Sequence, residues 1–242
     1  MEPGKHSSRA LKRKVLDLLN RDDFDQTLNE LCLLPGRRVV NPLVSFLCHH
    51  DQRIKWRAVT ALGVTVANLA EKDMESARVI MRRFMWMLND ESGGIGWGAP
   101  EAMAEIMACH ERLAEEYVHI LISYMREDAN FLEHEILQRG VVWGIGRLAQ
   151  VRPHLLQSRG VAHDLPLYLE SRDSMVRGLA IWALGLLGTE PARARLESFV
   201  SDDGEVELYL NRKLVTCSVG GLAKEALATL QQHEPLRPPS SL

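Results

Sequence analysis

The sequence is short of paired cysteines and of long apolar runs. Its four cysteines are isolated, and none forms the CxxC pair that a zinc ribbon or a redox dithiol needs. Isolated cysteines in helical runs are usually small buried hydrophobic residues. No apolar run approaches the ~20 residues that span a bilayer, and the polar N-terminus lacks the apolar region of a signal peptide. We therefore expect a cytoplasmic protein with reduced thiols.

Motifs that carry chemistry are equally scarce. The pairs His110-Glu111 and His134-Glu135 fall short of the HExxH zinc motif, because neither has a second histidine at its last position. The glycine-rich stretch 93–98 follows no strand and precedes no Lys-Ser/Thr pair, so it does not predict a nucleotide loop. No Gly-x-Ser-x-Gly nucleophile elbow occurs. The sequence thus predicts no catalytic residue, no metal site and no cofactor.

Charge of one sign is not in excess. The chain has 29 Lys and Arg against 32 Asp and Glu, a net charge of -3, which gives no global attraction to nucleic acid or to an anionic membrane. The basic cluster near the N-terminus is interpreted as a solvated helix face rather than a nucleic-acid arm; it comprises Lys5, Arg9, Lys12, Arg13 and Lys14. We expect no membrane partner, and a nucleic-acid partner is disfavoured.

Helical periodicity is what the sequence has in abundance. Apolar residues recur with a 3.6-residue period, and almost nothing alternates as a strand does. From residue 41 onward the predicted helices come in pairs, called A and B, with short polar turns between them. The A helices are expected at 42–49, 76–89, 115–127, 162–171 and 191–200. The B helices are expected at 52–70, 99–113, 131–150, 174–188 and 205–231.

The segments on either side of the pairs are predicted from capping signals and composition. A first helix capped by Ser7 or Ser8 reaches Asn20, and a second one begins after Asp22 or Asp23 and ends before Pro35-Gly36. Asn41-Pro42 is predicted to start the first A helix. The resulting organisation is an N-terminal helical cap over 1–40, a repeat array over 41–232 and a disordered tail over 233–242.

Aligning the B helices on one small residue shows an internal repeat. The aligned residues are separated by 41, 42, 39 and 36 positions, and they are Gly63, Ala104, Gly146, Gly185 and Gly221. A period near 40 with two helices per unit is typical of an α-solenoid. The segments 51–63 and 173–185 match most closely, since both run from Asp through a basic residue and two alanines to Leu-Gly.

This Asp…Arg…Ala…Ala-Leu-Gly pattern resembles HEAT and HEAT-like repeats of the phycobilisome-lyase type. The resemblance covers about residues 41–230. It implies an all-α, armadillo-like α-α superhelix of about five helix pairs, and it is close to silent on function.

Helical geometry divides each B helix into two faces. At ~100° per residue, one face carries small and apolar residues such as Val176, Ala180 and Leu184, and we expect it to pack on the partner A helix. The opposite face holds four of the five tryptophans of the chain, one from each of the first four repeats, namely Trp56, Trp97, Trp143 and Trp182. In a HEAT-like solenoid this face lines the concave side.

Two interpretations of this tryptophan stripe stay open. The indoles can pack against neighbouring helices as core filler. Alternatively they line a ligand groove, with Glu101 and Arg139 as charged anchors, because aromatic residues and Arg are enriched in binding hot spots. The loop residues Gly94, Gly96 and Gly98 would then hold Trp97 and Glu101 over the groove. Otherwise the loop is a turn that needs positive φ and close packing.

Three functions follow in decreasing order of support. The first is a scaffold that binds another protein, a peptide or a small planar ligand. The second is a lyase-like enzyme or a chaperone for a cofactor or chromophore, suggested only by the family resemblance. The third is a HEAT-like DNA glycosylase, which is disfavoured because the stripe holds one basic residue, Arg139.

Overall fold

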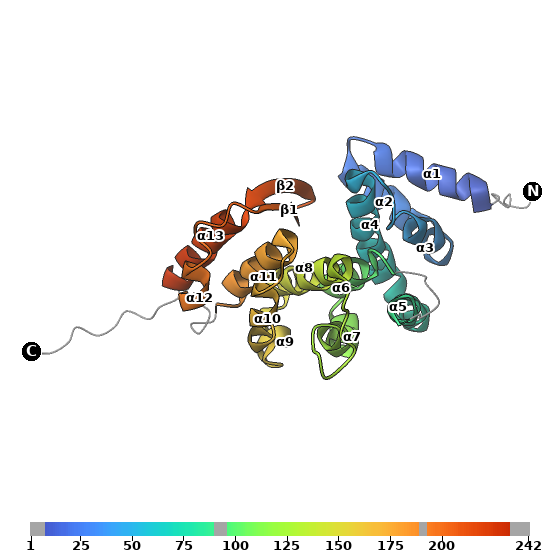
Figure 1. Ribbon diagram of the computed structural model, residues 1–242. Coiled ribbons are helices and arrows are strands. Elements are labelled where there is room, and N and C mark those ends of the chain that lie inside the picture. Colours follow the sequence, from blue (N-terminus) through green and yellow to red (C-terminus); the bar gives the residue numbers. More distant parts are fainter. Residues whose placement is uncertain (1–7, 90–95, 189–192, 233–242) are drawn as a thin grey trace, which may run out of the picture. The chain divides into compact units, whose positions relative to one another are not determined.

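The computed structural model describes residues 8–89, 96–188 and 193–232, and helices dominate it (Figure 1). The chain divides into two compact units, Met1–Leu121 and Ile122–Leu242. The expected all-α repeat architecture is confirmed in its main features. The exception within the described residues is one two-stranded antiparallel sheet. No described helix has both the length and the apolar character that crossing a membrane requires.

Unit 1 is built around its longest helix, α4, which packs on α3, α5 and α6. Asp51 starts α4, because its Oδ1 accepts a hydrogen bond of 2.8 Å from the N–H of Arg53. The helices are α1 (Ser8–Asn20), α2 (Phe24–Leu33), α3 (Gly36–Ser45), α4 (Gln52–Ala70), α5 (Met74–Leu88), α6 (Ala99–Cys109) and α7 (Glu111–Ser123), the last of which runs two residues past the unit boundary.

Unit 2 is built around α11, which packs on α8 on one side and α13 on the other. Asp173 caps α11 through Oδ1, and Gly188 ends it in the left-handed conformation at φ +66°. The elements are α8 (Glu135–Val151), α9 (Pro153–Gln157), the 3-10 helix η1 (Val161–His163), α10 (Pro166–Leu169), α11 (Ser174–Leu187), α12 (Arg193–Glu197), β1 (Glu205–Leu210), β2 (Lys213–Ser218) and α13 (Val219–Gln232).

The predicted core face of the B helices is confirmed. Val176, Ala180 and Leu184 of α11 are each fully buried. The corresponding residues of α4 and α8, such as Ile54 and Val141, are buried as well. Burying one such aliphatic side chain contributes roughly 1.5–3 kcal/mol, so this face supplies much of the stability of each repeat.

The predicted start of the first A helix at Asn41-Pro42 is wrong. Helix α3 begins at Gly36, after Pro35, whose carbonyl accepts hydrogen bonds from the N–H groups of Arg38 and Val39. Pro42 therefore lies inside the helix, where its ring is compatible with helical φ but its missing N–H leaves one backbone bond unmade.

The predicted fifth B helix over 205–231 is also wrong for its first half. Residues 205–218 form the hairpin of β1 and β2, and only 219–232 are helical. The local sequence alternates, so that Glu205 and Glu207 are exposed while Val206 and Leu208 are buried. Leu214 and Ser218, which a helix over 205–231 would place on the same face as Gly221, lie in β2 instead.

Two further boundaries differ from the predictions. The helix expected over 99–113 ends at Cys109, because His110 has an extended backbone, and α7 begins at Glu111. The helices expected over 162–171 and 191–200 are reduced to short pieces, namely η1 with α10, and α12. The predicted tail over 233–242 lies outside the described residues.

Candidate functional site

The four tryptophans of the stripe differ sharply in exposure. Trp56, Trp143 and Trp182 are 7%, 2% and 9% exposed, whereas Trp97 is 38% exposed. Trp97 also lies outside α6, in the turn that precedes it. For the three buried indoles the structure matches the packing interpretation, and Trp97 is the member that a ligand could reach directly.

In unit 1 the stripe contains a buried ion pair. Lys55 on α4 and Glu101 on α6 approach to 3.0 Å between Nζ and Oε1, and the Glu101 side chain is 5% exposed. The Lys55 ammonium also lies 5.2 Å from the centroid of the Trp56 ring, within the range of a cation–π contact. Glu101 is thus held by Lys55.

In unit 2 the charged residues link successive repeats. Nε of Arg139 on α8 donates to Asp173 Oδ2 at 2.8 Å, and Nη2 of Arg177 on α11 donates to Asp202 Oδ2 at 2.9 Å. The other oxygen of Asp173 caps α11. Each carboxylate therefore orders its own turn and also binds the preceding repeat. Arg177 therefore has a structural role at the turn between two repeats.

The buried indoles of unit 2 fill defined spaces. Trp143 donates from Nε1 to the carbonyl of Tyr209 on β1 at 3.0 Å, which satisfies its polar atom in the interior. The Trp182 ring occupies the space beside Gly146, where a Cβ would lie 2.1 Å from its Cζ3. The Gly146 position of the stripe therefore makes room for a neighbouring helix rather than for a guest molecule.

The glycine loop has the strained geometry that the packing interpretation requires. Gly98 has φ +80° and is the N-cap of α6, and a Cβ there would lie 2.8 Å from the Cβ of Leu47. A Cβ at Gly96 would lie 2.7 Å from the carbonyl oxygen of Met87. Gly94 lies outside the described residues. The backbone of Trp97, between Gly96 and Gly98, is also held by Cys48, whose thiol donates to the Trp97 carbonyl at 3.7 Å.

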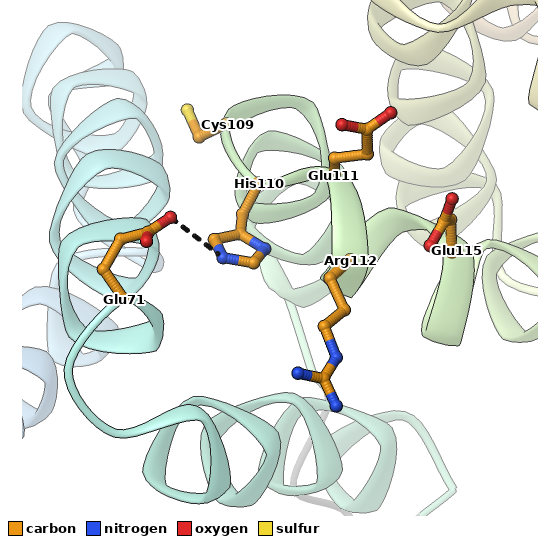
Figure 2. A pocket seen from close by; sticks show the side chains of 6 residues that line it. All are labelled: Glu71, Cys109, His110, Glu111, Arg112 and Glu115. Atoms are coloured by element: carbon orange, nitrogen blue, oxygen red, sulfur yellow. Dashed lines mark ion pairs between the residues drawn. The ribbon is translucent and has the colours of Figure 1, made fainter.

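A pocket elsewhere in unit 1 gathers ionisable side chains between the ends of α4, α6 and α7. Figure 2 shows them as Glu71, Cys109, His110, Glu111, Arg112 and Glu115. His110 Nε2 lies 3.4 Å from Glu71 Oε1, while Nδ1 accepts the N–H of Leu113. This arrangement joins α4 to the α6–α7 turn. No group of three metal-binding side chains gathers among the described residues.

Comparison with known proteins identifies the repeat type. Residues 135–187 match the HEAT-like repeat family. The chain has the fold of a HEAT-like repeat protein.

Relatives and solved structures agree with this assignment. An uncharacterized protein of Archaeoglobus fulgidus is 27% identical over 187 residues, which cover 76% of this chain and 92% of that protein. A solved engineered protein is similar with a TM-score of 0.51 and 16% identity, over 91% of this chain and 96% of the other. A designed armadillo repeat protein in complex with the peptide (KR)4 has a TM-score of 0.50 and 17% identity, over 90% and 98%.

No signal in the sequence pointed to one exposed surface, which lies on α5. Trp86 and Val79 on α5 are 81% and 54% exposed. They are seven residues apart, which places them on one side of the helix, close to Arg82 and Arg83. Trp86 is the one of the five tryptophans that lies outside the stripe, and the repeat pattern of the B helices carries no information on the outward face of an A helix.

Proposed function

We propose that this protein is a binding scaffold that holds a peptide or an extended segment of another protein. The observation that carries the proposal is the fold, since stacked helical repeats form extended binding surfaces. The similar designed armadillo repeat protein in complex with (KR)4 supports a peptide partner. This likeness concerns the fold, so the chemistry of the bound peptide has to come from the residues of this chain.

Trp97 is the proposed anchor for the bound segment. Its indole is exposed while its backbone is held by Cys48 and by the Gly98 turn. A rigid, partly exposed aromatic side chain loses little conformational entropy on binding and is typical of a hot spot. Glu101 lies in the first turn of α6, four residues after Trp97, and is therefore close to the proposed surface along the chain. Trp56, which is buried in the same unit, serves this surface indirectly by packing α4 within that unit.

An acid/base role for Glu101 is not part of the proposal. Its Oε1 is occupied by Lys55 Nζ at 3.0 Å inside the unit. A lyase-like or glycosylase reaction would need a carboxyl group that a substrate can reach, and the Glu101 side chain is 5% exposed.

The test is peptide binding by the full chain, followed by substitution of one exposed tryptophan at a time. Titration calorimetry with (KR)4, with the charge-reversed peptide (DE)4, and with peptides selected from a random displayed library would identify a ligand. Trp97→Ala is expected to weaken that ligand by roughly 30-fold, the effect of losing a hot-spot contact of about 2 kcal/mol.

Trp86→Ala is the matched control, because it removes another exposed indole of the same unit. It is expected to leave the dissociation constant within about twofold, as for a surface substitution away from the interface. If no library peptide binds, or if the two variants weaken binding equally, the proposal fails.

A further inference from the structure

The hairpin of unit 2 has one closed edge and one open edge. Along β1, alternate residues are capped by side chains of α8 and α11. The hydroxyl of Ser174 donates to the Glu205 carbonyl at 2.8 Å, the Glu207 N–H donates to Met175 Sδ at 3.0 Å, and the Trp143 indole N–H donates to the Tyr209 carbonyl. These contacts leave no room for a further strand beside β1. Figure 1 shows β2 on the other side of the hairpin.

Two residues of β2 that point away from β1, Leu214 and Thr216, have no such partners within the described residues. In an antiparallel pair, residues alternate between facing the partner strand and facing outward. The outward residues Glu207 and Tyr209 lie opposite Thr216 and Leu214, so these two also face outward. Across residues 8–89, 96–188 and 193–232, the N–H and C=O groups of Leu214 and Thr216 make no hydrogen bond.

Natural sheets guard such edges with charges, prolines or bulges. Here β2 has one charged residue, Lys213, at its turn end, and the rest of the strand is Leu-Val-Thr-Cys-Ser. Val215, between the two outward residues, is 40% exposed. An unguarded edge with an exposed β-branched residue at its middle accepts another extended strand.

We propose that two copies of this chain associate through their β2 edges, antiparallel, about a two-fold axis at Val215. In this register Leu214 of each copy pairs with Thr216 of the second copy, so the N–H and C=O groups of these two residues are satisfied in both copies. Val215 faces Val215 of the second copy as a directly opposed pair, and their Cβ atoms come within about 5.5 Å. The two hairpins become one four-stranded sheet with an isologous interface.

The charge pattern of β2 selects the antiparallel pairing. Lys213 lies opposite Cys217 of the second copy, so the two lysines are four residues apart along the sheet, about 13 Å. That separation exceeds the Debye length of about 8 Å at physiological ionic strength, so their repulsion is screened. A parallel pairing would place the two lysines side by side and leave them unscreened. The inference does not depend on the proposed peptide binding.

The test is the mass of the full chain in solution as a function of concentration. A single strand pair buries a small interface, so association is expected to be weak and to develop up to roughly 1 mM. Sedimentation velocity or light scattering is expected to show the mass rising toward twice that of the chain. The amides of Leu214 and Thr216 are expected to gain protection from hydrogen exchange over the same range.

Substitutions at the axis test the register. Val215→Lys and Val215→Glu each oppose like charges across the axis and are expected to leave only monomer, whereas an equimolar mixture of the two is expected to dimerise again. Val79→Lys is the matched control, since it places the same charge at another exposed valine, and it is expected to keep the wild-type mass curve. Circular dichroism establishes that each variant is folded.

Three results would overturn the inference: a wild-type chain that stays monomeric throughout, single variants that still dimerise, or a mixture that does not. A folded, monomeric Val215→Lys variant that still binds a selected peptide would separate this interface from the proposed scaffold function.

Discussion

Single residues carry the fit between one repeat and the next. Gly146 on α8 and Trp182 on α11 illustrate this, because the indole occupies the volume that a Cβ at Gly146 would need. Gly185 repeats the arrangement one helix later, where a Cβ would lie 2.7 Å from the Cβ of Ala226. Protein interiors are packed densely enough that even one added methyl group forces a shift.

Replacing Gly146 by Ala is expected to destabilise the protein. The new Cβ would lie 2.1 Å from Trp182 Cζ3, and the buried ring has little space in which to move. The cost of such overpacking is about 1–3 kcal/mol, measurable as a lower midpoint of denaturant unfolding. Gly36→Ala is the control, since the nearest atom to its added Cβ is 3.5 Å away, and it is expected to be neutral or slightly stabilising. Equal destabilisation by both changes would contradict this account.

Glu116 on α7 is expected to make the folded state sensitive to acid. Hydrogen bonds from Arg78, with smaller contributions from Arg112, lower the pKa of its carboxyl to about 2. A carboxyl with a lowered pKa in the folded state contributes stability above the pKa of the unfolded chain, about 4.3. That contribution disappears as the pH falls through about 2.

Glu116→Gln removes this contribution. The variant is expected to lose less stability than the wild type between pH 4.5 and 2, as followed by thermal unfolding at successive pH values. Glu115→Gln is the control, because it deletes an adjacent exposed carboxylate for which no ion pair is formed within the described residues. A wild-type pH slope in Glu116→Gln would show that the contact with Arg78 has no effect on stability.

For single residues, the sequence predicted the helix face on which a side chain lies better than it predicted which residue that side chain contacts. The 3.6-residue period placed Val176 and Trp182 on opposite faces of one helix, since that depends only on helical geometry. It could not predict that Glu101 pairs with Lys55, because a pair between helices depends on their offset and crossing angle. The Trp182 ring lies against Gly146 on the preceding B helix, α8, and this neighbour is known only when the helices are in place.

Among the elements, the hairpin shows where the prediction of fold failed. Acidic and apolar residues alternate over 205–208, and 213–218 is rich in residues that favour strands. Four alternating residues are a weak signal beside a repeat period that four helices share, so the repeat period predicted a helix there. The helices α4, α8 and α11 were predicted well because each is long and strongly periodic.

Replacing Arg212 in the hairpin turn by glycine is expected to stabilise the hairpin. Asn211 and Arg212 have φ of +50° and +64°, as a two-residue turn between twisted strands requires. Asn tolerates this conformation, but Arg does so at a cost of about 1 kcal/mol. Arg212→Gly is expected to stabilise the hairpin by up to that amount, seen as slower hydrogen exchange at β1 and β2. Asn211→Gly is expected to change exchange less, and the reverse order would contradict the argument.

Across the whole molecule, stability is expected to be local. Repeat proteins are held together mainly by contacts between neighbouring repeats, so damage in one place spreads over a limited distance. Gly146→Ala lies in the unit of residues 122–242. It is expected to speed amide exchange in α8 and α11 while α4 keeps its wild-type rates. Uniformly faster exchange in both units would show instead that the molecule unfolds as one cooperative block.

The spaces beside Gly146 and Gly185, each filled by a side chain of a neighbouring helix, limit how repeats can be added or exchanged. Each glycine accepts a different side chain, an indole in one case and a methyl group in the other. If α11 were duplicated, Trp182 of the second copy would lie against Gly185 of the first, where the space fits only the methyl group of Ala226. If another helix took the place of α11, the space beside Gly146 would stay unfilled. The repeats are alike in backbone but are not interchangeable modules. Each helix fits its neighbour through the size of one or two side chains, so the helices fit in only one order. We therefore expect that duplicating a repeat would destabilise this array, whereas consensus-designed repeats tolerate such lengthening.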